Sequence, residues 1–255
     1  MQTQTAATTD LRVSREERPI HFQREIERYF FDTPADCPYG LGRRAVYRQM
    51  PVVDLPAELY GLLLAAGFRR NGNTLYRMVC PDCRGCVSIR LDCGEFRPNR
   101  NQRRVAARNA GVAMTAGPLE VTDEKIDLLD RFLAARYPGR GSDGREYYAG
   151  FFLNRMTATF EIEYRIGDRL MGVAIVDVGD DWLNGVYHYF DPDLAGRSPG
   201  TNNVLRLVDF CRRARIRHFY LGYQIDEVPA MAYKTRFFPH QLLIDGMWQR
   251  QEKPA

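Results

Sequence analysis

The order of elements in the second half of the chain constrains the choice of fold. Three strand-like runs follow one another, and Gly167-Asp168 between the first two is a hairpin signal. The runs cover 159–166, 170–178 and 182–190. A polar loop over 191–200 then opens a helix near Thr201, and a further strand over 218–223 follows that helix. This pattern predicts an antiparallel sheet beside a loop that presents a helix N-terminus.

This order resembles the acyl-CoA N-acyltransferase architecture, in which such a loop–helix junction offers backbone N–H groups to the acyl donor. Here the junction reads Gly196-Arg197-Ser198-Pro199-Gly200-Thr201. We expect an α+β protein with a C-terminal GNAT-like (acyl-CoA N-acyltransferase-like) domain over 120–250. An N-terminal domain over 20–110 should precede it and carry most of the cysteines.

The front half contains the loop Cys80-Pro-Asp-Cys83-Arg-Gly-Cys86, and Cys37 lies upstream. Cysteines at every third position hold their thiolates close together, as zinc or an iron–sulfur cluster requires. Cys37, Cys80, Cys83 and Cys86 are therefore candidate ligands for either. The alternative is that they are reduced, buried thiols that pack as small apolar side chains.

Composition limits the class of protein. The 255 residues are 45% hydrophobic, which is typical of a globular fold. We see no run of roughly 18–20 apolar residues that would span a membrane. The first twenty residues have no apolar signal-peptide core, so we expect a cytoplasmic protein without a membrane partner. Six cysteines in such a chain do not indicate a disulfide framework.

The basic residues are nearly all arginine. Of 36 lysines and arginines, only Lys125, Lys234 and Lys253 are lysines. Guanidinium groups suit phosphate recognition, although a bias in genomic base composition would give the same excess. The segment 97–109 is the densest cluster and reads as a basic helix with Pro98 in its first turn.

Further motifs run along the chain in a fixed order. They are Cys37-Pro38-Tyr39 with Gly42-Arg43, Gly67-Phe68-Arg69-Arg70, Tyr76-Arg77 before the cysteine loop, Gln102-Arg103-Arg104, Tyr187-x-Tyr189-x-Asp191-Pro192, Gly200-Thr201, Tyr220-Leu221-Gly222-Tyr223, Met231-x-Tyr233-Lys234, Phe237 and Pro239. Together they cover 25–250 and resemble the aminoacyl-tRNA–protein transferases of the N-degron pathway, in both the aspartate/glutamate leucyltransferase and the arginyltransferase branches.

The resemblance implies an activity. An aminoacyl group would move from a charged tRNA to the α-amine of a protein that begins with Asp or Glu, which marks that protein for degradation. Aminoacyl-tRNA would be the donor substrate, and no nucleotide cofactor is expected. Length and compact layout favour leucyl over arginyl transfer. The sequence leaves the oligomeric state open.

The resemblance and the chemistry of ester aminolysis suggest roles for particular residues. Tyr187, Tyr189 and Asp191 are the catalytic candidates, because tyrosine and aspartate side chains could hold the water or acceptor that takes the proton. His188 alternates with these tyrosines and should point to the opposite face of the strand. The candidate substrate-binding residues are Arg43, Arg77, Arg84, Gly200, Thr201, Tyr223, Tyr233 and Lys234. The candidate tRNA-binding residues are Arg97, Arg100, Arg103, Arg104 and Arg108, all in the basic segment.

Some positions depart from the usual bacterial pattern. Pro199, Asn202 and Gln224 lie near the expected donor pocket, so they bear on which aminoacyl group is carried. Two other classes of function stay open at this stage. One is a small-molecule N-acyltransferase that uses acyl-CoA, and the other is a non-catalytic metal-cluster or RNA-binding protein on the same scaffold.

Overall fold

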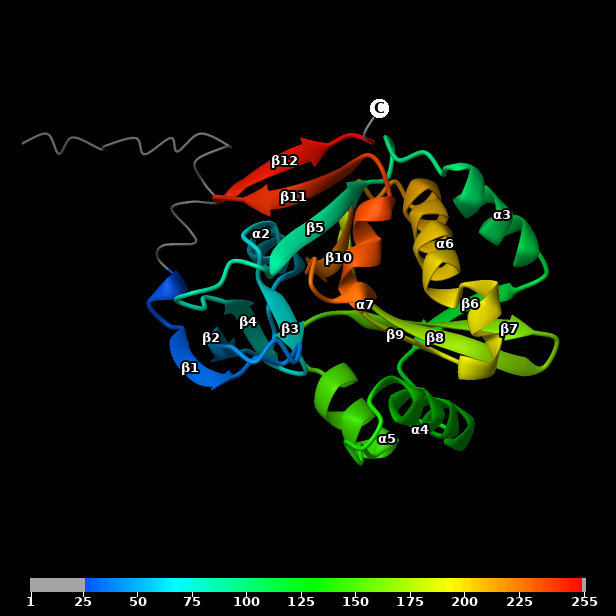
Figure 1. The fold of residues 1–255 in the computed structure, drawn as a ribbon, viewed down its shortest axis with the longest axis horizontal. Helices are drawn as coiled ribbons and strands as arrows, with labels where there is room; N and C mark the ends of the chain where they lie inside the picture. Colours follow the sequence, from blue (N-terminus) through cyan, green and yellow to red (C-terminus); the bar gives the residue numbers. More distant parts are fainter. Residues whose placement is uncertain (1–25, 254–255) are drawn as a thin grey trace, which may run out of the picture.

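The computed structural model describes residues 26–253, which form two β-sheets (Figure 1). The smaller sheet is antiparallel and has the order β1-β2-β4-β3. Its strands are β1 (Phe31–Asp36), β2 (Arg44–Pro51), β3 (Arg69–Asn71) and β4 (Thr74–Met78). Helix α2 (Ala57–Ala65) lies between β2 and β3, and Gly67 follows it with a φ of +90°, as expected for a helix C-terminus.

The larger sheet has eight strands in the order β12-β11-β5-β10-β9-β8-β7-β6. These are β5 (Val87–Asp92), β6 (Ala113–Pro118), β7 (Thr159–Ile166), β8 (Arg169–Val178), β9 (Trp182–Phe190), β10 (His218–Gln224), β11 (His240–Ile244) and β12 (Met247–Gln251). The predicted three-stranded meander is confirmed as β7, β8 and β9. Strand β5 belongs to this sheet although it lies within 20–110, so the larger sheet draws on both halves of the chain.

Helices cover both faces of the larger sheet (Figure 1). Helices α3 (Arg100–Arg108) and α6 (Pro199–Arg213) lie on one face. Helix α4 (Asp123–Arg136), helix α5 (Gly144–Tyr147) and the π-helical turn η1 (Tyr148–Phe152) lie on the other. Three short elements complete the fold: the 3₁₀ helix η2 (Pro192–Arg197), helix α7 (Pro229–Ala232) and the 3₁₀ helix η3 (Tyr233–Arg236).

Helix α2 joins the smaller sheet to the larger one. Its buried residues Tyr60, Leu63 and Leu64 share a hydrophobic cluster with Trp182 of β9 and Tyr220 of β10. Gly61 allows the close approach, because a Cβ atom there would lie 2.5 Å from the Trp182 indole nitrogen. In residues 26–253 we find no helix long and apolar enough to cross a membrane.

Two helix starts depend on side-chain caps. Thr122 is the N-cap of α4, because its side chain accepts a hydrogen bond from the Lys125 N–H. The basic helix, however, begins at Arg100 and not at residue 97. Asn99 caps the helix, because its side-chain oxygen accepts from the Gln102 N–H and its own backbone N–H donates to the Gln102 side chain. Arg97 and Pro98 therefore precede the helix.

The sequence over 145–156 predicts one helix, but the structure has only α5 and the turn η1, which ends at Phe152. Asn154 explains the early end. Its side-chain oxygen accepts hydrogen bonds from the Met156 and Thr157 N–H groups, and this turn is incompatible with a continuing helix.

Two further expectations were wrong at the sheet edges. The sequence over 111–121 predicts a linker, but this stretch contains β6, which pairs with β7 along its whole length. The sequence over 242–247 predicts a single last strand, but the structure has a hairpin of β11 and β12 there. Asp245 and Gly246 form its two-residue turn with φ values of +49° and +79°, a favoured hairpin geometry.

Candidate active site

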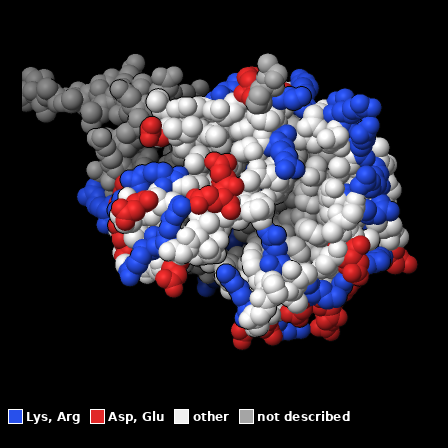
Figure 2. Space-filling model, in the orientation of Figure 1, with Lys and Arg blue, Asp and Glu red and all other residues white. Residues whose placement is uncertain are grey.

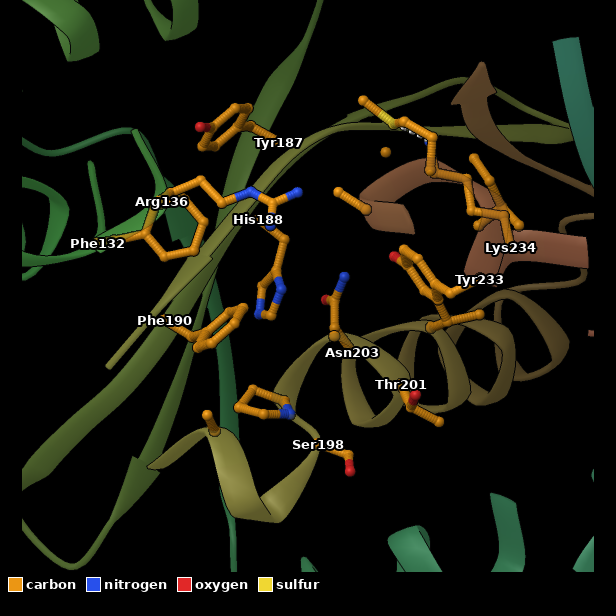
Figure 3. A pocket seen from close by; sticks show the side chains of 18 of the residues that line it. Phe132, Arg136, Tyr187, His188, Phe190, Ser198, Thr201, Asn203, Tyr233 and Lys234 are labelled. Carbon is orange, nitrogen blue, oxygen red and sulfur yellow. Dashed lines mark hydrogen bonds between the residues drawn. The ribbon is translucent and has the colours of Figure 1, made fainter. Parts of the chain in front are cut away.

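Strands β9 and β10 run parallel and then separate. They pair only where Trp182–Asn184 meet His218–Tyr220, and β9 has a bulge just beyond this point, opposite Ile175 and Val176. Gly185 keeps the strands close at the base, since a Cβ there would lie 3.2 Å from the Phe219 ring. A cavity of about 450 Å³ lies between the diverging ends (Figure 3).

The cavity is mainly apolar and carries few charges. Its apolar side chains come from α4, β9, η2, α6, β10 and α7, and they are Phe132, Val186, Phe190, Ala195, Pro199, Val204, Phe219, Leu221, Ala230 and Met231. Arg136 and Lys234 are its basic residues, and no Asp or Glu is among the described residues that line it. A neutral or anionic ligand group therefore suits this cavity better than a cationic one.

The N-terminus of α6 forms one wall. Ser198 adopts a left-handed conformation with a φ of +56°, and its side chain makes no capping hydrogen bond. Pro199 follows at the first helical position, so the N–H groups of Gly200 and Thr201 are the next donors, and they have no acceptor within the helix. Both residues line the cavity. An oxygen with partial negative charge would be stabilised here.

Lys234 forms the opposite wall (Figure 3). It is buried, and its Nζ donates hydrogen bonds to the Tyr223 carbonyl at 2.6 Å and to the Met231 sulfur at 3.3 Å. Burial and then the nearby Arg69 guanidinium lower the pKa of Lys234 to about 7. Two acceptors match the two N–H groups of a neutral amine, which leaves the lone pair free.

A group of tyrosines lies on the α4 side of the cavity. The Tyr187 ring lies 5.5 Å from that of Tyr147 between centroids. Burial and then the neighbouring Tyr147 raise the pKa of Tyr187 well above its ordinary value. Tyr137 and Tyr187 both line the cavity, as does Arg136, the last residue of α4. Polar hydroxyl groups and a guanidinium thus share this wall.

His188 and Asn203 line the cavity on the α6 side (Figure 3). The His188 ring lies 6.0 Å from that of Tyr164, which belongs to the hydrophobic cluster that includes α6. Tyr187 instead contacts Phe132 of α4, so the two side chains lie on opposite faces of β9. The His188 Nε2 is buried and has no hydrogen-bond partner within residues 26–253. Burial lowers the pKa of His188 to about 3, so the imidazole is neutral.

Comparison with known proteins decides the family. The family model "Arginine-tRNA-protein transferase, N terminus" matches residues 35–104, and "Arginine-tRNA-protein transferase, C terminus" matches residues 124–244. Together the two models cover more than half of the chain. This chain belongs to the arginine-tRNA-protein transferase family. It is therefore an aminoacyl transferase, which confirms the predicted class of enzyme.

Curated relatives of the transferase carry a more specific name. An aspartate/glutamate leucyltransferase of Thiobacillus denitrificans is 39% identical over 227 residues, which are 88% of this chain and 95% of the relative. One of Parvibaculum lavamentivorans is 39% identical, over 87% of this chain and 93% of the relative. One of Marinobacter nauticus is 37% identical, over 87% and 94%.

Solved structures with a similar trace have low sequence identity. FemX has a TM-score of 0.47 at 8% identity and covers 86% of this chain and 87% of its own. The C-terminal domain of a lysylphosphatidylglycerol synthetase of Agrobacterium fabrum has a TM-score of 0.46 at 14% identity, over 88% and 67%. The α+β fold rests on the two sheets of the structure and on the helices that cover both faces of the larger one.

The three catalytic candidates do not converge in the transferase. Tyr187 lines the cavity. Tyr189 is fully buried, stacks on Phe152 and has no partner for its hydroxyl among the described residues. Asp191 is held by Arg131 at 2.8 Å and Arg169 at 2.5 Å. Burial alone would raise the pKa of Asp191, but these two arginines lower it below its ordinary value.

Three of the four candidate substrate cations lie outside the cavity. Arg43 forms two hydrogen bonds with Glu227, at 3.0 and 2.9 Å. Arg77 pairs with Glu27 at 2.8 Å. Arg84 donates to the carbonyls of Cys80 and Cys83. Only Lys234 of this set lines the cavity.

The remaining substrate-binding candidates divide in the same way. Gly200, Thr201 and Tyr233 line the cavity. Tyr223 does not, and its hydroxyl donates to the Gly67 carbonyl at 3.3 Å. It nevertheless contributes the carbonyl that accepts from Lys234. Residues that the sequence analysis missed are Arg136 and Tyr137 at the end of α4, which no motif marks.

The five candidate tRNA-binding arginines are all exposed and lie on or just before α3. Arg97, Arg103 and Arg108 donate to backbone carbonyls. None of the five forms an ion pair within residues 26–253. Figure 2 shows basic side chains along this edge of the molecule, where α3 lies in Figure 1.

The structure brings Cys37 near the loop of Cys80, Cys83 and Cys86. Burial, followed by the thiols of Cys80, Cys37 and Cys83, raises the pKa of Cys86 to about 12. The set suits a soft metal by its chemistry but not by its arrangement, because no three Cys, His, Asp or Glu side chains in residues 26–253 are placed to hold a metal ion. The Cys83 sulfur instead accepts hydrogen bonds from Arg43 and from the Gly85 N–H.

Proposed function

We propose that the transferase moves a leucyl group from leucyl-tRNA to the α-amine of a protein that begins with Asp or Glu. The new N-terminal leucine would mark that protein for degradation in the cytoplasm. The observation that carries the proposal is the cavity between β9 and β10, which combines apolar walls, the uncapped N-terminus of α6 and a buried lysine.

The lining of the cavity favours a leucyl over an arginyl donor. A leucyl side chain would pack against groups such as Phe132, Val186 and Phe219. A guanidinium would enter a cavity that has no carboxylate on its described walls and two basic residues, Arg136 and Lys234. Burying a cation without a partner is unfavourable, so arginine should be the poorer donor.

The basic segment would bind the tRNA. Helix α3 packs on α6, and Arg108 donates a hydrogen bond to the Gly196 carbonyl in η2, just before the N-terminus of α6. Arg100, Arg103 and Arg104 continue the positive charge away from this point. An acceptor stem bound along α3 would deliver its aminoacylated end to the cavity.

The chemistry is aminolysis of an activated ester. The acceptor nitrogen attacks the ester carbonyl carbon, the bond to the ribose oxygen breaks, and an amide bond forms. The N–H groups of Gly200 and Thr201 would stabilise the negative charge that develops on the carbonyl oxygen. We propose that neutral Lys234 takes the proton from the attacking nitrogen and that the departing ribose oxygen receives it.

The other candidates would act by contact or by position. Tyr187 and Tyr233 would contact the substrates from opposite walls of the cavity, as their positions in Figure 3 allow. Asp191 and Tyr189 would hold the end of β9 in place, because their contacts are with Arg131, Arg169 and Phe152.

We also propose that zinc or an iron–sulfur cluster binds at the cysteine loop and stabilises it. Support comes from four thiols close enough to influence one another. Binding would require the Cys83 sulfur to leave Arg43, because thiolates bind metal through the same lone pairs that accept hydrogen bonds. No step of the reaction depends on this group.

Mass spectrometry of a reconstituted reaction tests the proposed function. Purified transferase is mixed with total tRNA, aminoacyl-tRNA synthetases, all amino acids and a peptide that begins with Asp. We expect a product that carries one added leucine. An added arginine, or an unmodified peptide, would overturn the proposal.

A further inference from the structure

Two basic side chains line the cavity and could meet an acidic substrate. They differ in burial and in their hydrogen-bond partners. Lys234 is buried and donates to two neutral acceptors. Arg136 is exposed and makes no hydrogen bond or ion pair with any other residue in 26–253. A guanidinium keeps its charge at any pH at which proteins fold. Arg136 is thus the permanent cation on the described walls of the cavity.

We propose that Arg136 binds the side-chain carboxylate of the acceptor's N-terminal Asp or Glu. The proposal rests on the proposed function above and names the residue that selects its protein substrate. A planar guanidinium can donate to both carboxylate oxygens of an Asp or Glu side chain at once. The amide of an Asn or Gln side chain has one oxygen and no negative charge, so it cannot bind in this way.

The position of Arg136 separates the acceptor from the tRNA. Arg136 ends α4, which covers the opposite face of the larger sheet from α3 and α6 (Figure 1). In Figure 3 its guanidinium points into the gap between β9 and the segment that carries Tyr233 and Lys234. A polypeptide end entering from the α4 side would therefore meet Arg136 while the tRNA occupies the α3 side.

Neighbouring groups leave Arg136 available for a carboxylate. Asp130 of the same helix has another partner, since it accepts from the Gly144 N–H at 2.6 Å. Asp191 is held by Arg131 and Arg169. The hydroxyl group of Tyr137, next in the chain, adds a further donor to the same wall.

The other arginines proposed from sequence are less suitable. Arg43 and Arg77 already bind carboxylates, Glu227 and Glu27 respectively. Arg84 lines a separate cavity beside the cysteine loop and Asp245. An acidic residue bound at any of these sites would lie outside the cavity in which the ester is expected to react.

Steady-state kinetics of Arg136→Gln with matched peptides tests the inference. The peptides differ only in their first residue, which is Asp, Glu, Asn or Gln. We expect kcat/KM for the acidic peptides to fall about 10- to 100-fold, with kcat/KM for the amide peptides nearly unchanged. Arg136→Lys should show an intermediate preference for Asp over Asn, because lysine keeps the positive charge but cannot donate to both carboxylate oxygens from one planar group.

Three measurements distinguish carboxylate binding by Arg136 from an RNA contact and from a general loss of activity. Arg213→Gln, an exposed arginine at the far end of α6, should leave the kinetics unchanged. Arg136→Gln should bind leucyl-tRNA as the unaltered protein does, and a loss of that binding would show an RNA contact and overturn the inference. Equal losses for Asp and Asn peptides would also overturn it. If the unaltered transferase shows no preference for acidic peptides, the proposed function itself fails.

Discussion

Arg70 of β3 and Asp177 of β8 form an ion pair whose side chains are both fully buried. The Arg70 Nη2 lies 2.7 Å from Oδ1 of Asp177, and its Nε lies 2.9 Å from Oδ2. Tyr60, Asn184 and Thr159 donate further hydrogen bonds to the same carboxylate. Because β3 belongs to the smaller sheet and β8 to the larger, this network fixes the two sheets to each other.

Loss of one partner of this pair should destabilise the fold. We expect Arg70→Met to lower the free energy of unfolding by about 3–5 kcal/mol, because Asp177 would remain buried without its counter-charge. Urea denaturation measures the change. The double variant Arg70→Met/Asp177→Leu should recover much of the loss. A cost below about 1 kcal/mol for the single variant would contradict a structural role for the pair.

Lys234 should make the folded protein less stable. Its pKa is about 7 in the fold against about 10.4 in an unfolded chain, so the unfolded state binds an extra proton between these values. Stability should therefore rise with pH across this window and carry the full penalty below it. We expect Lys234→Met to raise the free energy of unfolding at neutral pH by a few kcal/mol. The exposed Lys253→Met, as a matched control, should have no effect.

The same lysine should govern the pH dependence of transfer. Below a pH of about 7, Lys234 becomes protonated and can no longer take a proton from the acceptor amine. Arg69 is the charged group that faces it, and no carboxylate contacts its Nζ within residues 26–253. The ratio of kcat/KM for the unaltered enzyme to that for Lys234→Met should rise with pH and level off above 7. This ratio cancels the titration of the peptide amine, and a flat profile would rule out Lys234 as the proton acceptor.

Binding of tRNA should depend on the exposed arginines of α3. For each of Arg100→Gln and Arg104→Gln, we expect the slope of log K against log salt concentration to become shallower by roughly 0.7–0.9, because one phosphate contact is lost. Fluorescence anisotropy with labelled leucyl-tRNA measures the slope. Arg213→Gln serves as the control on α6, and an unchanged slope in both α3 variants would place the tRNA elsewhere.

Metal content should respond to a single cysteine. We expect the purified protein to contain zinc or iron. The Cys83→Ser variant should lose this metal, because only three of the four thiolate ligands would remain. Elemental analysis gives the metal content of both proteins. Cys211→Ser serves as the control, because Cys211 lies on α6 and is buried in the core. Equal metal content in the unaltered protein and in Cys83→Ser would remove the case for a site at this loop.

Much of the larger sheet could be predicted from sequence, because strong periodicity and turn signals mark β7, β8 and β9. The edges could not. Strand β6 contains Gly117 and Pro118, which disfavour a strand, and pairing with β7 outweighs this preference. The Asp245-Gly246 turn is a strong hairpin signal, but the short apolar run that flanks it reads as a continuous strand.

The candidate site was predictable only where a motif reaches the cavity. Gly200, Thr201, Tyr233 and Lys234 lie in motifs and line it. Arg43 and Arg77 also lie in motifs, but tertiary ion pairs occupy them, and sequence does not show such pairs. Arg136 is one arginine among many in the sequence, and only the fold shows that it lies at the cavity without a described partner.

A crystal structure with a non-hydrolysable leucyl-adenosine analogue tests the central claim most directly. The analogue replaces the ester oxygen with an amide nitrogen and mimics the charged end of the tRNA. We predict its leucyl side chain between β9 and β10, with the carbonyl oxygen near the Gly200 and Thr201 N–H groups and the carbonyl carbon facing Lys234. Density for the analogue at the cysteine loop or on an outer face of the sheet, with an empty cavity, would contradict the account.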